Sequence, residues 1–335
     1  MKKFLTLHKY WRKWIWMMMP SRETIKTLFT EAQSVLLASH IRPDGDAVGS
    51  LLGLGNALIL SGKNVFMALS DGLPSNFHYL HGAHLVKRFV PKDLKFDLTI
   101  SLDTSDLDRS GGIFGNREII LNIDHHITNT LFAQYNLNDP ESVATCALVA
   151  ENLEHWGLSM NAETASLLMT GIITDTIGFR TSNMSSKAMR IAADLIDNGA
   201  DLPTIYQQAL TNKSFDQLIY WGYALKKLQQ NDRLAWTTLT LDDRKDAGYN
   251  GNDDADLNTI LSSIIDCDIT ILFVEQNNGH VKVSWRGKSG FNVSNLAQSL
   301  GGGGHPAASG ANIEGSLEDV QFTVIKKTLE MMKEN

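Results

Sequence analysis

Short apolar runs of strand length alternate, along the first 200 residues, with segments whose apolar positions recur at helical spacing. Strand-like runs occupy residues 34–40, 64–70, 96–103 and 117–124. Helical periodicity marks residues 47–62, 144–157 and 185–200. Short β-rich runs that alternate with helices are typical of an α/β protein. The pattern therefore predicts a mostly parallel sheet with helices on both faces.

The pattern changes near residue 201. Residues 201–231 show helical periodicity and are expected to bridge two domains. After them, 233–241 is strand-like, and 269–287 contains two apolar runs around Asn-Asn-Gly, which is a hairpin signal. The expected parts are an N-terminal extension at 1–20, a larger α/β domain at 21–200, a helical linker at 201–231, and a smaller α/β domain at 232–335 across a cleft.

Length, charge and cysteine content narrow the class of protein. A chain of 335 residues agrees with two domains, because single cores rarely grow beyond about 250–300 residues. The net charge of −7 argues against a large basic surface for long nucleic acids, although a local positive pocket for a small anion remains compatible with it. Cys146 and Cys267 match no metal-ligand spacing, so we expect reduced thiols in a cytoplasmic protein.

The N-terminal segment KYWRKWIWMMMP combines aromatic and basic residues, which suits a membrane surface. Its apolar part is too short for a signal peptide, and no run in the sequence is long and apolar enough to span a bilayer. The globular pattern begins only after Pro20. We therefore favour an extension outside the folded domains and expect no transmembrane segment.

Candidate chemistry lies where apolar runs end. The runs SVLLASH, FDLTISLD, REIILNID and MTGIITD each finish on an acid or a histidine, and each is predicted to be a strand. In an open parallel sheet, ligands bind at the carboxyl ends of the strands. The side chains expected to meet at that edge are His40, Asp44, Asp46, Asp103, Asp124, His125, His126 and Asp175.

Each of these acids alone has an ordinary structural explanation. An aspartate after a strand commonly caps a helix, and Asp44 and Asp46 would suit the turn in PDGD. The coincidence of four such ends favours metal ligands instead. Carboxylates with few imidazoles and no thiolate suit hard ions such as Mn²⁺ or Mg²⁺, and two ions would clamp the attacking and leaving oxygens of a phosphoryl displacement. Their charge balances four carboxylates: Asp44, Asp46, Asp103 and Asp175.

A second candidate site lies near the C-terminus. Gly301–Gly304 expose backbone N–H groups without steric cost, and such loops bind anions. His305 follows directly, and Arg286 lies on the preceding strand, where its guanidinium can hold a phosphate through two hydrogen bonds. A flexible linker is the alternative, but the helical stretch before the glycines and the HPAAS after them argue against it.

The motifs HIRPDGDAVGS, SLDTSD, NIDHHITN and TGIITDT resemble, in the correct order, the four motifs of the DHH phosphoesterase superfamily. GGGGHPAASG, preceded by VSWRG, resembles the substrate loop of the DHH-associated C-terminal domain. The resemblance covers roughly residues 30–335. Length and loop style are similar to the NrnA-type branch, which contains oligoribonucleases and 3′-phosphoadenosine-5′-phosphate phosphatases.

The resemblance implies a catalytic domain at 21–200 that holds two manganese ions, with magnesium as the other option. One ion would be held by His40, Asp44 and Asp103. The other would be held by Asp46, Asp103, His125 and Asp175, with Asp103 shared. His126 would face the scissile phosphate, and Asp124 would orient a ligand histidine. The implied substrate contacts of the C-terminal domain are Arg286, Gly303, Gly304 and His305.

The implied activity is hydrolysis of short oligoribonucleotides and linear dinucleotides to mononucleotides, removal of the 3′-phosphate of 3′-phosphoadenosine-5′-phosphate, or both. The alternative within the superfamily is a cyclic di-AMP phosphodiesterase. A non-catalytic nucleotide-binding regulator is the alternative from another class, but it would be expected to lack metal ligands, and none is missing here. Family II pyrophosphatases lack the GGGGH pattern, and RecJ exonucleases are longer. The resemblance also makes a homodimer plausible.

Overall fold

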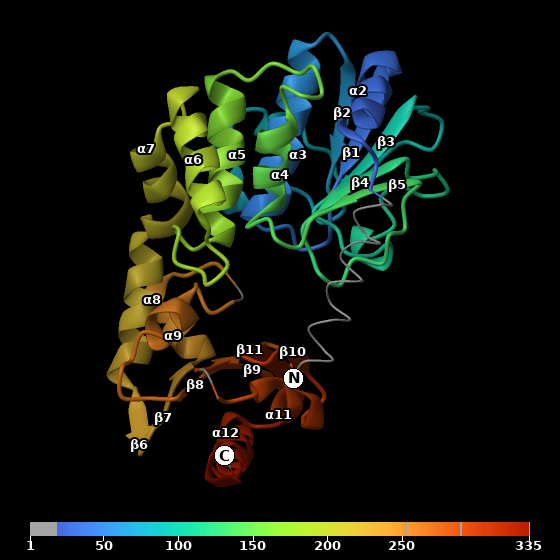
Figure 1. Ribbon diagram of the computed structural model, residues 1–335. Helices are drawn as coiled ribbons and strands as arrows, with labels where there is room; N and C mark the ends of the chain where they lie inside the picture. The colour runs from blue at the N-terminus through green and yellow to red at the C-terminus, as the bar shows by residue number, and fades with distance from the viewer. Residues whose placement is uncertain (1–18, 252, 289, 335) are drawn as a thin grey trace, which may run out of the picture. The chain divides into compact units, whose positions relative to one another are not determined.

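Figure 1 shows the computed structural model, which describes residues 19–251, 253–288 and 290–334. The chain divides into two compact units, the first ending at Asn212 and the second beginning at Lys213. This boundary falls inside the segment 201–231 that was expected to bridge two domains. Most of the expected N-terminal extension, residues 1–18, lies outside the described residues.

The first unit contains a five-stranded sheet in the order β2-β1-β3-β4-β5, and every neighbouring pair is parallel. Its strands are β1 (Ser34–Ala38), β2 (Asn64–Ala68), β3 (Leu98–Leu102), β4 (Leu121–Asp124) and β5 (Tyr135–Asn138). The α/β class and the parallel sheet are therefore confirmed. Strand β5 was not expected, because its four residues are too few to establish a period.

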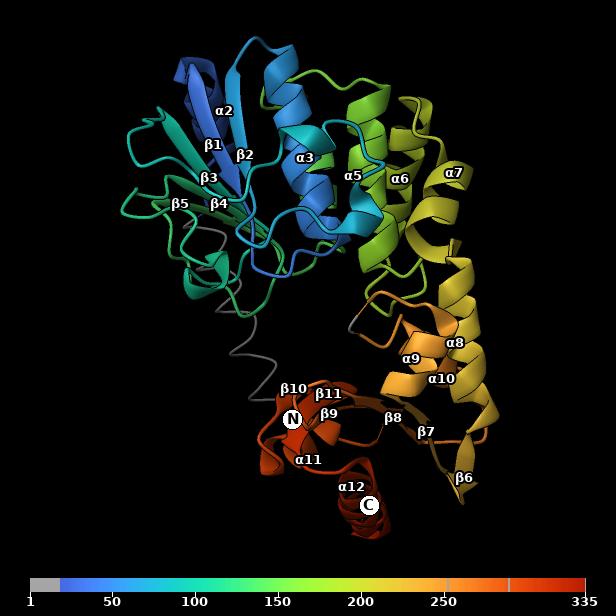
Figure 2. The same cartoon turned by 180° about the vertical axis from the view of Figure 1, so that it is seen from behind.

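Helices of the first unit gather beside the sheet, and α3, α5, α6 and α7 follow one another in both views (Figures 1 and 2). The helices are α2 (Arg22–Glu31), α3 (Gly45–Leu60), α4 (Thr145–Asn152), α5 (Ala162–Asp175), α6 (Ser186–Asp197) and α7 (Leu202–Tyr206), which continues into a π-helical turn at Gln207–Thr211. Val35 and Leu37 of β1 share one core with α2, α3, α4 and α5.

The second face of this sheet differs from the expectation of helices on both faces. Leu36 and Ala38 of β1 point into a separate core, where Ile113, Phe114 and Ala133 pack from the connections between strands. The chain runs from β3 to β4 and from β4 to β5 without an α-helix. Among the described residues, loop side chains therefore cover this face.

The prediction of a strand at MTGIITD was wrong, because these residues form the C-terminal half of α5. Asn161 caps the helix by accepting the backbone N–H of Thr164, and good helix formers lead into the apolar run without a break. A run of seven residues does not by itself distinguish a strand from a buried helix. Asp175 therefore ends a helix rather than a strand.

Helices α3 and α5 approach closely because α3 carries glycine where α5 passes it. A Cβ atom at Gly49 would lie 2.7 Å from the carbonyl oxygen of Leu167, and one at Gly45 would overlap the side chain of Thr174. Real Cβ contacts of this kind do not occur, so only glycine permits the packing. This contact brings the end of α5, with Asp175, beside the start of α3.

The second unit contains a six-stranded mixed sheet in the order β10-β11-β9-β8-β7-β6, in which only β7 and β8 are parallel. Its strands are β6 (Gln229–Asn231), β7 (Leu234–Leu239), β8 (Ile269–Glu275), β9 (His280–Gly287), β10 (Gly303–His305) and β11 (Ala308–Glu314). The expected hairpin is confirmed as β8 and β9.

Helices cover both faces of the second sheet. They are α8 (Phe215–Lys226), α9 (Leu241–Ala247), α10 (Leu257–Leu261), α11 (Val293–Ser299) and α12 (Leu317–Glu334). Helices α11 and α12 pack with Val283 and Trp285 of β9, whereas α8, α9 and α10 pack with Leu272 and Val274 of β8. No helix in the described part of the chain is long and apolar enough to cross a membrane.

Replacing Gly49 tests the contact between α3 and α5. Gly49→Ala forces a methyl group against the Leu167 carbonyl oxygen and should lower the free energy of unfolding by about 1–3 kcal/mol. Gly222→Ala in α8 is the matched control, because its methyl group would meet nothing within 4 Å. The control should raise the free energy of unfolding by about 0.5–1 kcal/mol. Urea denaturation measures both, and a Gly49→Ala protein of wild-type stability would contradict the close packing.

Candidate metal centre

The ends of three parallel strands supply the centre of the site. His40 follows β1 by two residues, Asp103 follows β3 directly, and β4 ends at Asp124 ahead of His125. These strands are neighbours in the sheet, so their carboxyl ends share one edge. The backbone of Asp103 has φ 53°, a left-handed conformation that aspartate and asparagine tolerate better than most residues.

The start of α3 adds two carboxylates with different surroundings. Asp44 is exposed and caps the helix, since its Oδ1 accepts the backbone N–H groups of Asp46 and Ala47 at 3.1 Å each. Asp46 is buried and accepts the N–H groups of Thr145 and Cys146, at 2.6 and 2.9 Å, from the start of α4. Asp44 therefore has the capping role expected of an isolated aspartate, and it is also a member of the cluster of acids.

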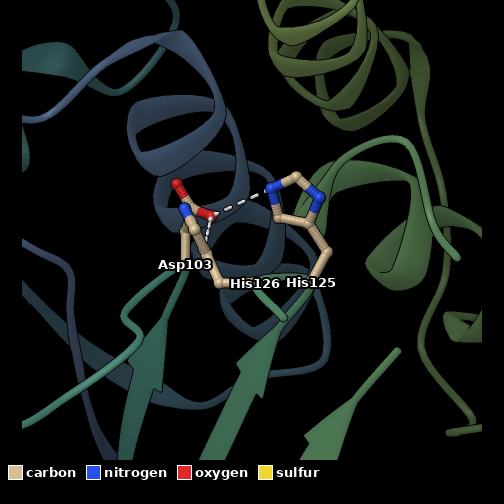
Figure 3. Close-up of side chains that lie close together, drawn as sticks. All are labelled: Asp103, His125 and His126. Atoms are coloured by element: carbon tan, nitrogen blue, oxygen red, sulfur yellow. Dashed lines mark ion pairs between the residues drawn. The ribbon is translucent and has the colours of Figure 1, made fainter. Parts of the chain in front are cut away.

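The structure brings the predicted ligands together in two groups, whose possible ligand atoms lie within 4.8 Å of one another. The first group is His40, Asp44 and Asp103. The second is Asp46, His125 and Asp175. Asp103 also groups with His125 and His126 (Figure 3), so this carboxylate lies where both groups can reach it. The side chains expected to form two ion sites thus converge on one place.

Both imidazoles expected to bind metal are turned in the same way. Nδ1 of His40 lies 2.8 Å from the carbonyl oxygen of Ile41, and Nδ1 of His125 lies 3.2 Å from that of Ser142. A carbonyl oxygen can only accept, so each Nδ1 carries the proton. Each Nε2 then faces the carboxylates, at 3.4 Å from Asp103 Oδ2 for His40, and is the nitrogen available to bind a cation. This is the orientation that metal-binding histidines adopt.

His126 is held differently from the other two histidines. Its Nδ1 donates to Oδ1 of Asp124 at 2.7 Å, and Oδ2 of Asp124 accepts the side-chain amide of Asn129 at 2.5 Å. We expected Asp124 to orient a ligand histidine, but His125 gives it only a backbone N–H, so the ring that Asp124 orients is that of His126. The His126 side chain is 33% exposed, which leaves the ring accessible to a small molecule.

Electrostatics disfavour this cluster of charges in the absence of cations. Burial raises the pKa of Asp46, Asp103 and Asp175, the neighbouring carboxylates raise it further, and for Asp175 the pKa reaches about 7. Burial lowers the pKa of His125, but the three carboxylates outweigh burial and the pKa rises overall. Within the described ranges, the ion pairs of these three aspartates are all with histidines.

Three residues that contact the site were missed in the sequence. Thr145 donates through Oγ1 to Asp103 Oδ1 at 3.0 Å, its backbone and that of Cys146 hold Asp46, and Asn129 holds Asp124. The start of a helix at ATCALVA was visible as a signal, because a helix N-terminus offers free N–H groups to a carboxylate. Asn129 is the last residue of the NIDHHITN motif, but it was given no role in the site.

The second unit brings its predicted substrate residues into one row. Arg286 on β9 and His305 on β10 both pair with Ala308 on β11, so their side chains leave the same face of the sheet. Gly304 has φ 138°, and a Cβ atom there would lie 2.6 Å from the carbonyl oxygen of Ala308, so only glycine fits. A Cβ atom at Gly303 would meet nothing within 4 Å, which leaves its backbone open.

Comparison with known proteins identifies two families. Residues 34–172 match the DHH family, N-terminal domain, and residues 233–333 match the DHHA1 domain. A protein of Thermus thermophilus named "Bifunctional oligoribonuclease and PAP phosphatase NrnA" is 29% identical over 97% of this chain and 95% of its own length. The DHH range contains HIRPDGDAVGS, SLDTSD and NIDHHITN and ends at residue 172, inside TGIITDT, and the DHHA1 range contains VSWRG and GGGGHPAASG.

Two further proteins bear on fold and substrate. The crystal structure of an exopolyphosphatase-related protein from Bacteroides fragilis superposes with a TM-score of 0.84, at 25% identity over 92% of this chain and 95% of that one. The cyclic-di-AMP phosphodiesterase GdpP of Bacillus subtilis is 24% identical over 90% of this chain, which spans only 49% of GdpP. The second similarity is more distant than that to the Thermus protein.

The response of thermal stability to manganese and pH tests the site. In the folded protein, the pKa of Asp175 is raised from 3.8 to about 7. The stability that its protonated carboxyl contributes is therefore complete below the pKa of the unfolded state and is lost as the pH rises through the pKa of the folded state. The metal-free protein should therefore melt at a lower temperature at about pH 8 than at about pH 6. Manganese should raise the melting temperature more at the higher pH, where the carboxylates are charged and free of protons.

The matched variant for that measurement is Asp175→Asn, which keeps the volume of the side chain and removes its charge. It should melt with a weaker pH dependence and gain less from manganese. Equal manganese shifts at both pH values in the wild-type protein, or no shift at all, would contradict a cation site built from these acids.

Proposed function

The chain belongs to the DHH family, and from this membership we propose that it is a metal-dependent phosphoesterase that acts on short nucleotides. The proposed reactions are hydrolysis of short oligoribonucleotides and linear dinucleotides to mononucleotides, and removal of the 3′-phosphate of 3′-phosphoadenosine-5′-phosphate. The relative from Thermus thermophilus, named for both activities, supports this pair. The single observation that carries the proposal is the convergence of the two ligand groups at one edge of the parallel sheet.

The donor set fits hard divalent cations. Asp46 and Asp103 are each about 1% exposed, and a carboxylate at that depth is stable as an anion only beside a cation. Carboxylates with a minority of imidazoles and no thiolate ligand suit Mn²⁺ or Mg²⁺. We propose that His40, Asp44 and Asp103 hold one ion, and that Asp46, Asp103, His125 and Asp175 hold the other.

Bound divalent ions would lower the pKa of a water molecule and neutralise charge on phosphate oxygens. The residues of the chain contribute by fixing the donors in advance. The N–H groups of α4 fix Asp46, and the hydroxyl of Thr145 fixes Asp103, so neither carboxylate has to reorganise when a substrate binds.

His126 is the proposed donor to the substrate. The hydrogen bond to Asp124 raises the pKa of His126, which favours the protonated ring. With Nδ1–H directed to Asp124, the other nitrogen is free to donate a proton or a hydrogen bond to the leaving oxygen or to a phosphate oxygen. Asp124 thus acts by orienting His126.

The second unit is proposed to bind the rest of the nucleotide. Arg286 and His305 leave one face of its sheet in register, and Gly303 and Gly304 lie directly before His305 on the strand β10. Burial lowers the pKa of Arg286, while Asp254 acts in the opposite direction, so the guanidinium is partly withdrawn from water. A partly buried guanidinium binds phosphate more strongly than an exposed one.

Cyclic di-AMP remains a test substrate rather than the favoured one, because the relative that is named for it is the more distant of the two.

We further propose a cytoplasmic location, because Cys146 and Cys267 are both free thiols. The homodimer expected from the sequence stays a prediction, which light scattering would test.

A substrate panel tests the proposed function. With manganese, wild-type protein should release mononucleotides from a pApA-type dinucleotide and phosphate from 3′-phosphoadenosine-5′-phosphate, and should act on cyclic di-AMP more slowly. Asp103→Asn should lower kcat/KM by at least about 10³-fold, because it removes a charge shared by both ligand groups. Asparagine is the matched replacement, since it tolerates the left-handed backbone at this position.

Two results of this panel would count against the proposal. Wild-type protein that binds manganese but turns over none of the three substrates would favour a nucleotide-binding regulator. An Asp103→Asn protein that keeps most of its turnover would show that the chemistry lies elsewhere in the chain.

A further inference from the structure

Thr145 is the first residue of α4, and it contacts two aspartates of the candidate metal centre that come from different elements. Its backbone N–H donates to Oδ2 of Asp46 at 2.6 Å, and its side-chain Oγ1 donates to Oδ1 of Asp103 at 3.0 Å. Asp46 belongs to the first turn of α3, whereas Asp103 follows β3. Thr145 is fully buried, so water does not compete for either contact. One residue thus links the two carboxylates.

The start of α4 is free to make these contacts, because no side chain of its own caps it. The N-cap residue is Ala144, and the first N–H groups of a helix have no partner within the helix. The carboxylate of Asp46 accepts two of them, from Thr145 and Cys146, and a negative charge is favourable at this end of a helix. Asp46 therefore caps α4, and this contact keeps Thr145 in place whatever side chain it carries.

The two oxygens that Thr145 holds lie beside the same imidazole nitrogen. Oδ2 of Asp46 and Oδ1 of Asp103 are each 3.7 Å from Nε2 of His125. Oδ2 of Asp175 is a third carboxylate oxygen there, at 3.6 Å from this nitrogen. These four residues are the ligands proposed for one of the two ions, and we call them the His125 site. Thr145 therefore holds two of the carboxylate oxygens of the His125 site.

The carboxylate of Asp103 directs its two oxygens to different ligand groups. Oδ2 lies 3.4 Å from Nε2 of His40, on the side of the other proposed ion, whose ligands His40, Asp44 and Asp103 we call the His40 site. The plane of an aspartate carboxylate turns easily about χ2. Among the described residues, the hydroxyl of Thr145 makes the only hydrogen bond that this carboxylate accepts. The hydroxyl therefore fixes the plane in which one oxygen faces each site.

We propose that Thr145 is a positioning residue that sets the affinity of the His125 site for its ion and affects the His40 site much less. The asymmetry follows from the contacts, because Thr145 holds Asp46 and the Oδ1 of Asp103, whereas His40 faces the Oδ2. A hydrogen bond that orients a metal ligand in advance spares the cost of ordering it when the ion binds. The inference rests on the two ion sites of the proposed function.

Calorimetric titration of the full chain with manganese tests this role. Thr145→Val removes the hydroxyl but keeps the branched shape and the backbone N–H that holds Asp46. Wild-type protein should bind two ions, and Thr145→Val should lose about 10–100-fold in affinity for one of them, with the other nearly unchanged. Asp175→Asn and Asp44→Asn assign the two affinities, because each residue belongs to one site only. The weakened ion should be the one that Asp175→Asn also weakens.

Two further variants separate the hydroxyl from other effects of the substitution. Thr145→Ser keeps the hydroxyl and should bind both ions as wild type does, whereas Thr145→Ala should behave like Thr145→Val. Serine and alanine differ by the hydroxyl alone, so this pair carries the test if Thr145→Val does not fold. Thr170→Val is the matched control, because it removes a buried hydroxyl that donates to the carbonyl oxygen of Ser166 within α5. Both manganese affinities of this control should equal those of wild type.

The manganese dependence of turnover is a second readout. With limiting manganese, Thr145→Val should hydrolyse a pApA-type dinucleotide more slowly than wild type. With enough manganese to saturate the weakened site, most of the activity should return, because the hydroxyl acts through the ligands and touches no substrate. A loss that persists at saturating manganese would contradict a role in ion affinity.

The outcomes separate this inference from the proposed function. If wild-type protein binds two ions and turns over substrate, and Thr145→Val matches both affinities, the inference fails alone. Equal losses at both sites, or a loss confined to the ion that Asp44→Asn weakens, would also overturn it. If wild-type protein binds two ions but turns over no substrate, the proposed function fails, and the two affinities still report on Thr145.

Discussion

Mutual repulsion among buried carboxylates is the constraint on which the first unit depends. Asp46 and Asp103 are almost completely enclosed, and Asp175 lies beside them with a pKa raised by burial and by Asp46 to about 7. A fold normally avoids such an arrangement, because each burial costs free energy that no apolar contact returns. Here three elements converge to create it: the strand ends, the glycine-lined start of α3 and the end of α5. Bound cations would offset this cost, and the neighbouring hydrogen bonds already hold the carboxylates and imidazoles in position to bind them.

The histidines of the candidate metal centre differ in the hydrogen-bond partner of Nδ1 and in the charge of that partner. Nδ1 of His40 and Nδ1 of His125 each lie against a carbonyl oxygen, whereas Nδ1 of His126 donates to the carboxylate of Asp124, which raises the pKa of that ring. The two rings proposed to bind metal are therefore distinguished from the ring proposed to donate a proton by the partner of each Nδ1. The second unit differs, because Arg286 and His305 leave one face of its sheet and none of its described residues belongs to a candidate metal group.

The sequence predicted the elements whose information is local. Runs such as SVLLA and LTISL are too apolar for the surface and too short for buried helices, so their ends and the ligands there could be located. Alternation along β9 directs Trp285 away from Arg286, and Trp285 is fully buried in the core. The run before Asp175 was misassigned, because its composition suits a strand or a helix equally. Thr145 reaches Asp103 only through packing between distant segments, whereas Asn129 contacts Asp124 from five residues further along the chain.

Anomalous diffraction from crystals grown with manganese would test the central claim most directly, because it locates each ion without reference to activity. The account predicts two peaks in the first unit, one among His40, Asp44 and Asp103 and the other among Asp46, His125 and Asp175, with Asp103 in contact with both. Crystals that contain manganese but show no peak at these side chains would contradict it.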